Sequence, residues 1–143
     1  MNVRELTGPC GMDCFNCQVY EKNITKELIE ILSKSTQKDP SEIPCKGCRA
    51  KKGGGILWMR ECKTYKCASI MGVEFCFECS NFPCYKLLPC SSKADKFPHN
   101  MKIFNLCMIK RVGIEKWAKQ SVDIRIRYFK GEFVPGLGPV IKK

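Results

Sequence analysis

The grouping of the cysteines constrains this fold more than any other feature of the sequence. The chain has 143 residues and 12 cysteines, ten of which fall between residues 10 and 84 in sets with gaps of two to four residues. Short gaps bring several thiolates onto one turn, which is the arrangement that a tetrahedral metal site needs. We therefore predict ten metal ligands: Cys10, Cys14, Cys17, Cys45, Cys48, Cys62, Cys67, Cys76, Cys79 and Cys84.

The cellular compartment decides between metal ions and disulfide bonds. Residues 1–9 lack the apolar segment of a secretory signal, and no stretch approaches the roughly eighteen apolar residues of a membrane span. These features predict a cytoplasmic protein without membrane contact. Cytoplasmic thiols stay reduced, so metal binding is favoured over disulfides. We expect zinc, about two ions per chain, with a 4Fe–4S cluster as the alternative cofactor.

The same composition predicts a small metal-stapled fold that is mainly α-helical, with irregular cysteine-rich loops (zinc knuckles) and little β structure. Residues 50–81 have few long apolar runs, and a core of that kind usually needs a covalent or metal staple. We expect residues 1–90 to form a cysteine-rich metal-binding domain. Residues 91–143 are expected to form a basic helical extension, with C-terminal helices and one short strand or tail packed on it.

Apolar spacing predicts helices in the first two thirds of the chain. An amphipathic helix is expected over residues 24–34, capped by Asn23 and packed on the cysteine-rich part. A second is expected over residues 56–71 with Gly72 as its stop, and a short third over residues 84–88. The glycines at 53–55 are interpreted as a linker, because a phosphate loop would end in Gly-Lys-Ser/Thr.

The last third of the chain is expected to contain a helix that ends at Gly113 and a short helix around Trp117. The first of these helices would carry Met101, Phe104, Met108 and Val112 on one face. Beyond them, apolar and basic residues alternate over residues 124–128, which predicts one strand with a basic outer face.

Two Cys-x2-Cys turns, Cys45–Cys48 and Cys76–Cys79, are typical of zinc knuckles. In such a turn both thiolates point inward, backbone N–H groups donate to sulfur, and a glycine adopts the left-handed conformation without strain. Gly47 occupies that place in the first knuckle, whereas Glu78 occupies it in the second. One four-cysteine site shared by the two knuckles is the leading pairing, although spacing alone leaves the connectivity open.

The set Cys10-x3-Cys14-x2-Cys17 supplies three ligands and lacks an adjacent fourth. The same spacing occurs in radical S-adenosylmethionine enzymes, but Asn16 stands where those enzymes carry an aromatic residue, and their part-barrel exceeds 143 residues. A structural site is the favoured interpretation. Its fourth thiolate would come from one of three candidates, namely Cys62, Cys67 or Cys84.

The complete arrangement resembles a cysteine-rich prokaryotic family of unknown function to which zinc binding is attributed. The resemblance covers residues 8–88 and lies in Cys10-Gly-Met-Asp-Cys14-Phe-Asn-Cys17, Cys45-Lys-Gly-Cys48, Cys62-x4-Cys67, Cys76-x2-Cys79 and Phe-Pro-Cys84. It implies a small cytoplasmic protein with no established reaction. Members often carry a further cysteine shortly before the position of Cys62, where this chain has Ile-Leu-Trp-Met at residues 56–59.

Five other residues have side chains that could take part in chemistry. Cys90 and Cys107 are expected to be buried free thiols, and His99, the one histidine, to be a solvated loop residue. Asp13 and Glu78 lie within the cysteine loops and could orient a ligand or act on bound water, although loop carboxylates are usually solvated. No hydrolase, zinc-protease or dinucleotide motif is present, so an enzyme is the least favoured interpretation.

The formal charge of +11 falls when metal-bound thiolates are counted, but it stays positive. A basic chain is compatible with nucleic acid or an acidic protein partner, although a solvated lysine-rich surface explains the same charge. The candidate basic face consists of Lys110, Arg111, Lys116, Lys119, Arg125, Arg127 and Lys130, with Tyr128 and Phe129 available to stack on bases. The competing hypothesis is an iron–sulfur protein in electron transfer or redox sensing.

Overall fold

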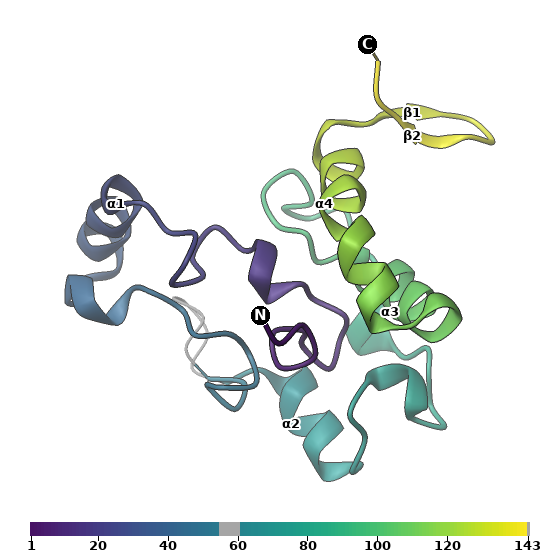
Figure 1. Cartoon of the computed structure of the whole chain (residues 1–143), viewed down its shortest axis with the longest axis horizontal. Coiled ribbons are helices and arrows are strands. Elements are labelled where there is room, and N and C mark those ends of the chain that lie inside the picture. The colour runs from purple at the N-terminus through teal and green to yellow at the C-terminus, as the bar shows by residue number, and fades with distance from the viewer. Residues whose placement is uncertain (55–60, 143) are drawn as a thin grey trace.

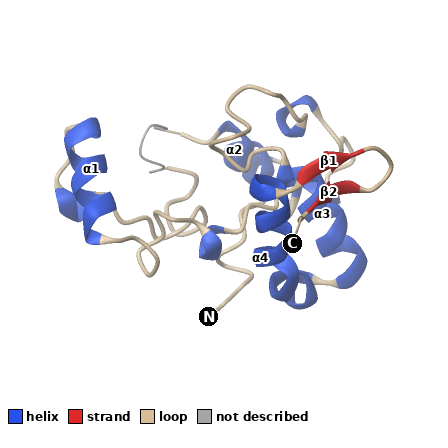
Figure 2. Cartoon of the chain, turned by 90° about the horizontal axis from the view of Figure 1, so that it is seen from above, coloured by secondary structure: helices blue, strands red, loops and turns tan. Residues whose placement is uncertain are grey.

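Helices dominate the structure, a computed structural model that describes residues 1–54 and 61–142 (Figure 1). These residues contain the α-helices α1 (Lys26–Thr36), α2 (Lys63–Ile70), α3 (Met101–Val112) and α4 (Ile114–Lys130). Short 3-10 helices lie at Cys14–Asn16, Pro40–Glu42, Cys76–Glu78 and Tyr85–Leu87, and the strands β1 (Glu132–Val134) and β2 (Gly138–Val140) form one hairpin. The prediction of a mainly helical chain with irregular cysteine-rich loops and little β structure is confirmed (Figure 2).

One hydrophobic core joins the cysteine-rich loops to α3 and α4. Trp117 is fully buried, and its ring meets that of Phe15 edge to face at 5.9 Å between centroids. Leu87 and Leu106 are also buried in this cluster, as is Phe75. The N-terminal loop and the C-terminal helices therefore share their apolar contacts.

The predicted helix ending at Gly113 is confirmed as α3, but its buried face was only partly predicted. Met101 and Met108 are buried as expected, whereas Phe104 is 54% exposed. Asn105 takes the inner position, where its Nδ2 donates to the Gly11 carbonyl at 2.8 Å. A polar residue is tolerated there because each of its side-chain groups finds a partner in the core.

The predicted strand over residues 124–128 is wrong, because α4 continues as one helix to Lys130. The side chains that turn inward are Trp117, Ser121, Ile124, Arg125 and Tyr128, which recur at helical spacing and are buried or half-buried. The alternation of isoleucine and arginine over a few residues thus reflects two faces of a helix. The predicted short helix around Trp117 is the first part of the same element.

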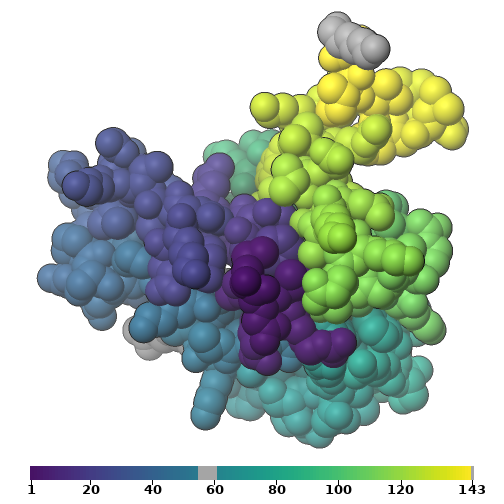
Figure 3. Space-filling model, viewed as in Figure 1, coloured from purple at the N-terminus to yellow at the C-terminus, as the bar shows by residue number. Residues whose placement is uncertain are grey.

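A β-hairpin follows α4 and occupies the tail. β1 and β2 pair antiparallel with Glu132 opposite Val140 and Val134 opposite Gly138. β2 also contacts α4, where Arg127 Nη1 donates to the Pro139 carbonyl at 3.3 Å. The hairpin stands out from the body of the molecule in the space-filling view, as the yellow segment of Figure 3 shows.

Helix α1 begins two residues later than predicted and packs elsewhere. Its cap is Thr25, whose hydroxyl accepts a hydrogen bond from Leu28 N–H at 3.2 Å. Asn23, the predicted cap, instead donates its amide to the Phe15 carbonyl at 2.7 Å. The expected packing of α1 on the cysteine-rich part is wrong, because α1 buries no residue and contacts the 3-10 helix Pro40–Glu42. α1 accordingly projects from the rest of the chain (Figures 1 and 3).

Helix α2 covers residues 63–70 of the helix predicted over residues 56–71. Residues 61 and 62 precede it and are not helical, and residues 56–60 lie outside the described chain. Gly72 follows its end with φ +65°, as expected for a stop. Gly53, interpreted as linker, instead packs against α2. It has φ +78°, and a Cβ at this position would lie 2.7 Å from Tyr65 Cβ, so a side chain is excluded. The short helix predicted over 84–88 is the 3-10 helix Tyr85–Leu87.

Candidate metal centre

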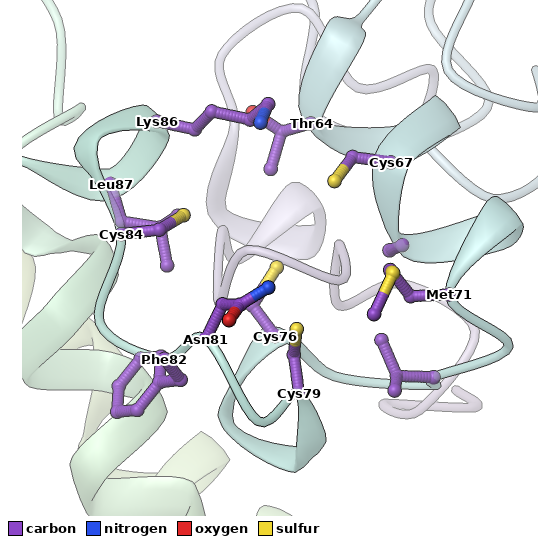
Figure 4. A pocket seen from close by; sticks show the side chains of 12 residues that line it. Thr64, Cys67, Met71, Cys76, Cys79, Asn81, Phe82, Cys84, Lys86 and Leu87 are labelled. Carbon is purple, nitrogen blue, oxygen red and sulfur yellow. The ribbon is translucent and has the colours of Figure 1, made fainter.

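Four cysteines line one small pocket beside α2. Cys67, Cys76, Cys79 and Cys84 surround a cavity of about 30 Å³, which is about the volume of one water molecule in the liquid. Figure 4 shows the sulfur atoms of these four residues turned toward the space between them. The rest of the wall is mostly apolar and includes Ala68, Met71, Val73 and Phe82. The pocket therefore brings four thiols to the wall of one small, mostly apolar space.

Three separate segments supply these thiols. Cys67 lies in α2. Cys76 is the first residue of one 3-10 turn and Cys79 directly follows that turn. Cys84 directly precedes a second 3-10 turn. A hydrogen bond from Cys79 N–H to the Cys76 carbonyl, 3.2 Å long, closes the turn between them. Any ion held here would connect α2 to both turns.

The Cys76 thiol of this pocket resists ionisation in the absence of a cation. Burial raises the pKa of the Cys76 thiol to about 12, and the nearby thiols of Cys10, Cys84, Cys67 and Cys79 add to the effect. A raised thiol pKa means that the proton remains bound at neutral pH. A metal cation must displace this proton to bind, so binding at such a site weakens as the pH falls.

A second group of cysteines gathers around the loop of residues 10–17. A Cβ at Gly8 would lie 3.7 Å from Cys10 Sγ and 3.8 Å from Cys48 Sγ, so these two sulfurs flank one glycine. The pKa of Cys48 is raised by burial first, and then by the neighbouring thiols of Cys10, Cys14 and Cys62. Four thiols from three segments are therefore electrostatic neighbours here as well.

The first knuckle, Cys45–Cys48, has the predicted geometry. Gly47 adopts φ +96°, and its N–H donates to Cys45 Sγ at 3.4 Å. The knuckle is held beside the loop 10–17 by a hydrogen bond from Cys45 N–H to the Val19 carbonyl at 2.8 Å. Cys45 is also among the neighbours that raise the pKa of Cys17, for which burial is the largest cause.

The predicted pairing of the two knuckles in one site is not what the structure shows. Cys76 and Cys79 line the pocket with Cys67 and Cys84, whereas the Cys45–Cys48 knuckle lies with the loop 10–17. Of the three candidates for a fourth ligand to that loop, Cys67 and Cys84 belong to the pocket. The third, Cys62, neighbours Cys10 and Cys48.

All twelve cysteines are free thiols. Within residues 1–54 and 61–142, no three side chains of His, Cys, Asp or Glu are drawn together closely enough to form a ready-made metal site. The four thiols of the pocket thus surround a space without yet converging on one point.

Asp13 is a buried charged residue whose burial was not predicted from the sequence. It is 1% exposed, so its interpretation as a solvated loop carboxylate is wrong. Arg125 contacts it through both ends of the guanidinium group, with Nη2–Oδ1 at 2.6 Å and Nε–Oδ2 at 3.2 Å. Asn16 Nδ2 donates to Asp13 Oδ2 at 2.9 Å and to Ser121 Oγ at 2.9 Å. This network attaches the loop that carries three cysteines to α4.

Glu78 has a local structural role in the second knuckle. Its carboxylate accepts hydrogen bonds from the backbone N–H groups of Glu74 at 2.8 Å and Phe75 at 3.2 Å. These contacts cap the start of the 3-10 turn that presents Cys76. The carboxylate therefore stabilises the turn and does not line the thiol pocket.

The expectation that Cys90 and Cys107 are buried is wrong, since both are exposed. Cys107 belongs to an apolar run in α3 whose neighbours Leu106 and Met108 are buried, but three consecutive helical residues cannot all face the core. His99, expected to be solvated, is half-buried with Nε2 at 3.5 Å from Cys90 Sγ.

The predicted basic face survives in part. Its lysines and arginines on α3 and α4 are exposed, except for Arg125, which is half-buried and forms an ion pair with Asp13. Tyr128 is not free to stack on bases, because its hydroxyl donates to the Phe97 carbonyl at 3.0 Å and its ring packs edge to face on Phe129. Phe129 is 40% exposed.

No helix in the described part of the chain has the length and apolarity that a bilayer crossing requires.

Together these features define a small, mainly helical, cysteine-rich protein. Residues 6–89 match the family described as "Protein of unknown function (DUF3795)". The match spans more than half of the chain, so the protein belongs to this family. Searches of curated proteins and of solved structures found no match. The predicted resemblance to a cysteine-rich family of unknown function is thereby confirmed, while zinc binding and prokaryotic origin stay predictions.

Proposed function

We propose that this chain is a cytoplasmic zinc-binding protein whose metal ions hold its cysteine-rich loops together. The observation that carries the proposal is the pocket in which Cys67, Cys76, Cys79 and Cys84 face one small space. Four thiolates are the donor set of closed, tetrahedral structural zinc sites. Because these four come from three segments, one ion would replace much of the apolar packing that the region lacks.

The residues of the pocket fit zinc chemically. Its wall supplies four sulfur donors and otherwise consists largely of apolar side chains, which suits a closed site without a position for a substrate. The thiols would draw inward on binding, toward Zn–S distances of about 2.3 Å. Such coupling of site formation to the ion is usual in small metal-dependent domains.

We assign a second zinc ion to the cysteines around the loop 10–17. This group comprises Cys10, Cys14, Cys17, Cys45, Cys48 and Cys62. The glycine conformation and the N–H to sulfur contact in the Cys45–Cys48 knuckle support the assignment. Six thiols exceed the four that one ion requires, so two of them either remain neighbours of the site or bridge to a further ion.

Metal analysis of the reduced protein, purified without air, tests this proposal. We expect a colourless protein with about two zinc ions per chain. Cys79→Ser should lose roughly one of them, because a hydroxyl is a poor substitute for a thiolate in a four-cysteine site. Elemental analysis by mass spectrometry gives both the metal and its amount.

Cys107→Ser is the matched control, since Cys107 is exposed and lies outside both groups of thiols. This variant should retain the full zinc content. A brown protein that contains iron and acid-labile sulfide would instead support the iron–sulfur hypothesis for electron transfer or redox sensing. A Cys79→Ser variant that kept all its zinc would contradict the assignment of the pocket.

The exposed basic residues of α3 and α4 support a binding role toward nucleic acid or an acidic protein partner. Single-stranded oligonucleotide is the simplest probe, and its affinity should fall as salt rises. Three phosphate contacts would reduce affinity roughly twentyfold between about 50 and 200 mM salt. The double variant Lys116→Glu/Lys119→Glu on α4 should bind more weakly than Lys34→Glu on α1, as measured by fluorescence anisotropy. An affinity for the oligonucleotide that did not change with salt concentration would refute the electrostatic interaction.

A further inference from the structure

We propose that Cys90 and His99 form a nucleophilic thiol site that reacts with hydroperoxides, separate from both groups of metal-binding thiols. The two side chains meet in the irregular segment before α3, where His99 Nε2 lies 3.5 Å from Cys90 Sγ. A thiolate is stabilised by an adjacent imidazolium, and this pairing is the usual means by which proteins activate a cysteine. Cys90 and His99 lie just beyond residues 6–89 that match the family, so the site lies outside the matched segment.

The backbone around Cys90 is fixed so that the imidazole stays beside the sulfur. Asn100 makes two hydrogen bonds to Cys90, from Cys90 N–H to Asn100 Oδ1 and from Asn100 Nδ2 to the Cys90 carbonyl, each 2.9 Å long. The Cys90 carbonyl also lies 3.2 Å from His99 Nε2. A proton on Nε2 can therefore be shared between this carbonyl and the sulfur. A third contact anchors the segment to α4, where the Tyr128 hydroxyl donates to the Phe97 carbonyl at 3.0 Å.

Cys90 combines accessibility and an imidazole as no other cysteine of the chain does. The ten cysteines between residues 10 and 84 are buried or half-buried, which leaves Cys90 and Cys107 as the exposed pair. The chain has one histidine. Because His99 contacts Cys90, Cys107 is an exposed thiol without an imidazole neighbour, and it provides a control within the same molecule.

The reaction with hydrogen peroxide is balanced by the two side chains. The Cys90 thiolate attacks one oxygen of the peroxide, the O–O bond breaks, and the departing hydroxide takes the proton from the His99 imidazolium to leave as water. Sulfur is oxidised by two electrons to a sulfenic acid, and the peroxide is reduced to water. The half-buried imidazole then regains a proton from solvent.

Competitive alkylation of the full, metal-loaded chain tests the site. The protein is treated with limiting iodoacetamide at pH 7, and the rates at Cys90 and Cys107 are compared by peptide mass spectrometry. An ordinary cysteine is only a few per cent thiolate at this pH, and a stabilised thiolate is intrinsically somewhat less nucleophilic. We therefore expect Cys90 to react roughly tenfold faster than Cys107.

His99→Gln removes the imidazolium but keeps a side-chain donor for the Cys90 carbonyl. It should lower the Cys90 rate to that of Cys107 and leave Cys107 unchanged. After one equivalent of hydrogen peroxide, a dimedone adduct should form at Cys90 in the natural protein and not in His99→Gln. Equal rates at Cys90 and Cys107, or an unaltered ratio in His99→Gln, would overturn the proposal. A changed Cys107 rate in His99→Gln would indicate that this variant is unfolded. The variant His99→Asn, which also keeps Asn100, is then measured in its place, and its Cys90/Cys107 ratio decides the outcome.

Discussion

Chelation of the proposed zinc ions under reducing conditions is expected to abolish the tertiary structure of the cysteine-rich part. Structural zinc binds to small peptides with an apparent free energy of about 10–16 kcal/mol, which is as large as the whole stability of a typical domain, about 5–15 kcal/mol. Here one shared core links those loops to α3 and α4. Trp117 is fully buried in the folded structure. Its fluorescence emission should therefore shift to longer wavelength when unfolding exposes the ring to water.

The measurement uses the variant Trp58→Phe, so that Trp117 is the one reporter of the two tryptophans in the chain. Trp58 itself lies outside the described residues. Addition of zinc should restore the spectrum, whereas magnesium, which prefers oxygen ligands, should not. A reduced, chelated protein that kept its thermal transition would show that the metal does not stabilise the fold.

Arg125→Met is expected to destabilise the protein by about 3–5 kcal/mol, because it leaves the buried carboxylate of Asp13 without its cation. Arg125 is less than one fifth exposed and contacts both oxygens of that carboxylate. Arg127→Met is the matched control on the same helix. Arg127 is exposed and makes a 3.3 Å hydrogen bond to a hairpin carbonyl, so its loss should cost about 0.5 kcal/mol or less.

Urea unfolding of each variant in the presence of zinc gives the two differences in the free energy of unfolding. The double variant Asp13→Asn/Arg125→Met should recover part of the loss, since it removes the unpaired charge while keeping an amide that can bond to Asn16. If Arg125→Met and Arg127→Met had equal stability, the contact with Asp13 would contribute nothing to folding.

Local patterns in the sequence were sufficient for some elements. α3 was predicted because its apolar residues recur at helical spacing up to Gly113, and the turn geometry at Gly47 followed from the Cys-x2-Cys spacing. The grouping of the thiols along the chain also indicated which residues could gather. These features depend on residues only a few positions apart, where spacing determines geometry.

Other elements depend on contacts that no short window contains. The isoleucine and arginine alternation in α4 resembles a strand over five residues, and the helical face becomes visible only when Trp117 and Ser121 are included. The pocket forms because α2 places Cys67 beside the turn that carries Cys76 and Cys79. The spacing of the cysteines along the sequence does not determine this contact. The pairing of Asp13 with Arg125 joins residues 112 positions apart, and the contact of His99 with Cys90 arises from an irregular segment.

The long-range attachment of the loop 10–17 to α4 sets an order for synthesis in the cell. Asp13 and Asn16 meet partners that are 112 and 105 positions later in the chain. At translation rates of about 5–20 residues per second, roughly 5–20 s pass before α4 has been made. During this interval the first three thiols emerge without their helical cover. The proposed metal ligands of this loop are therefore accessible to metal ions and to oxidants before the last helix packs over the loop.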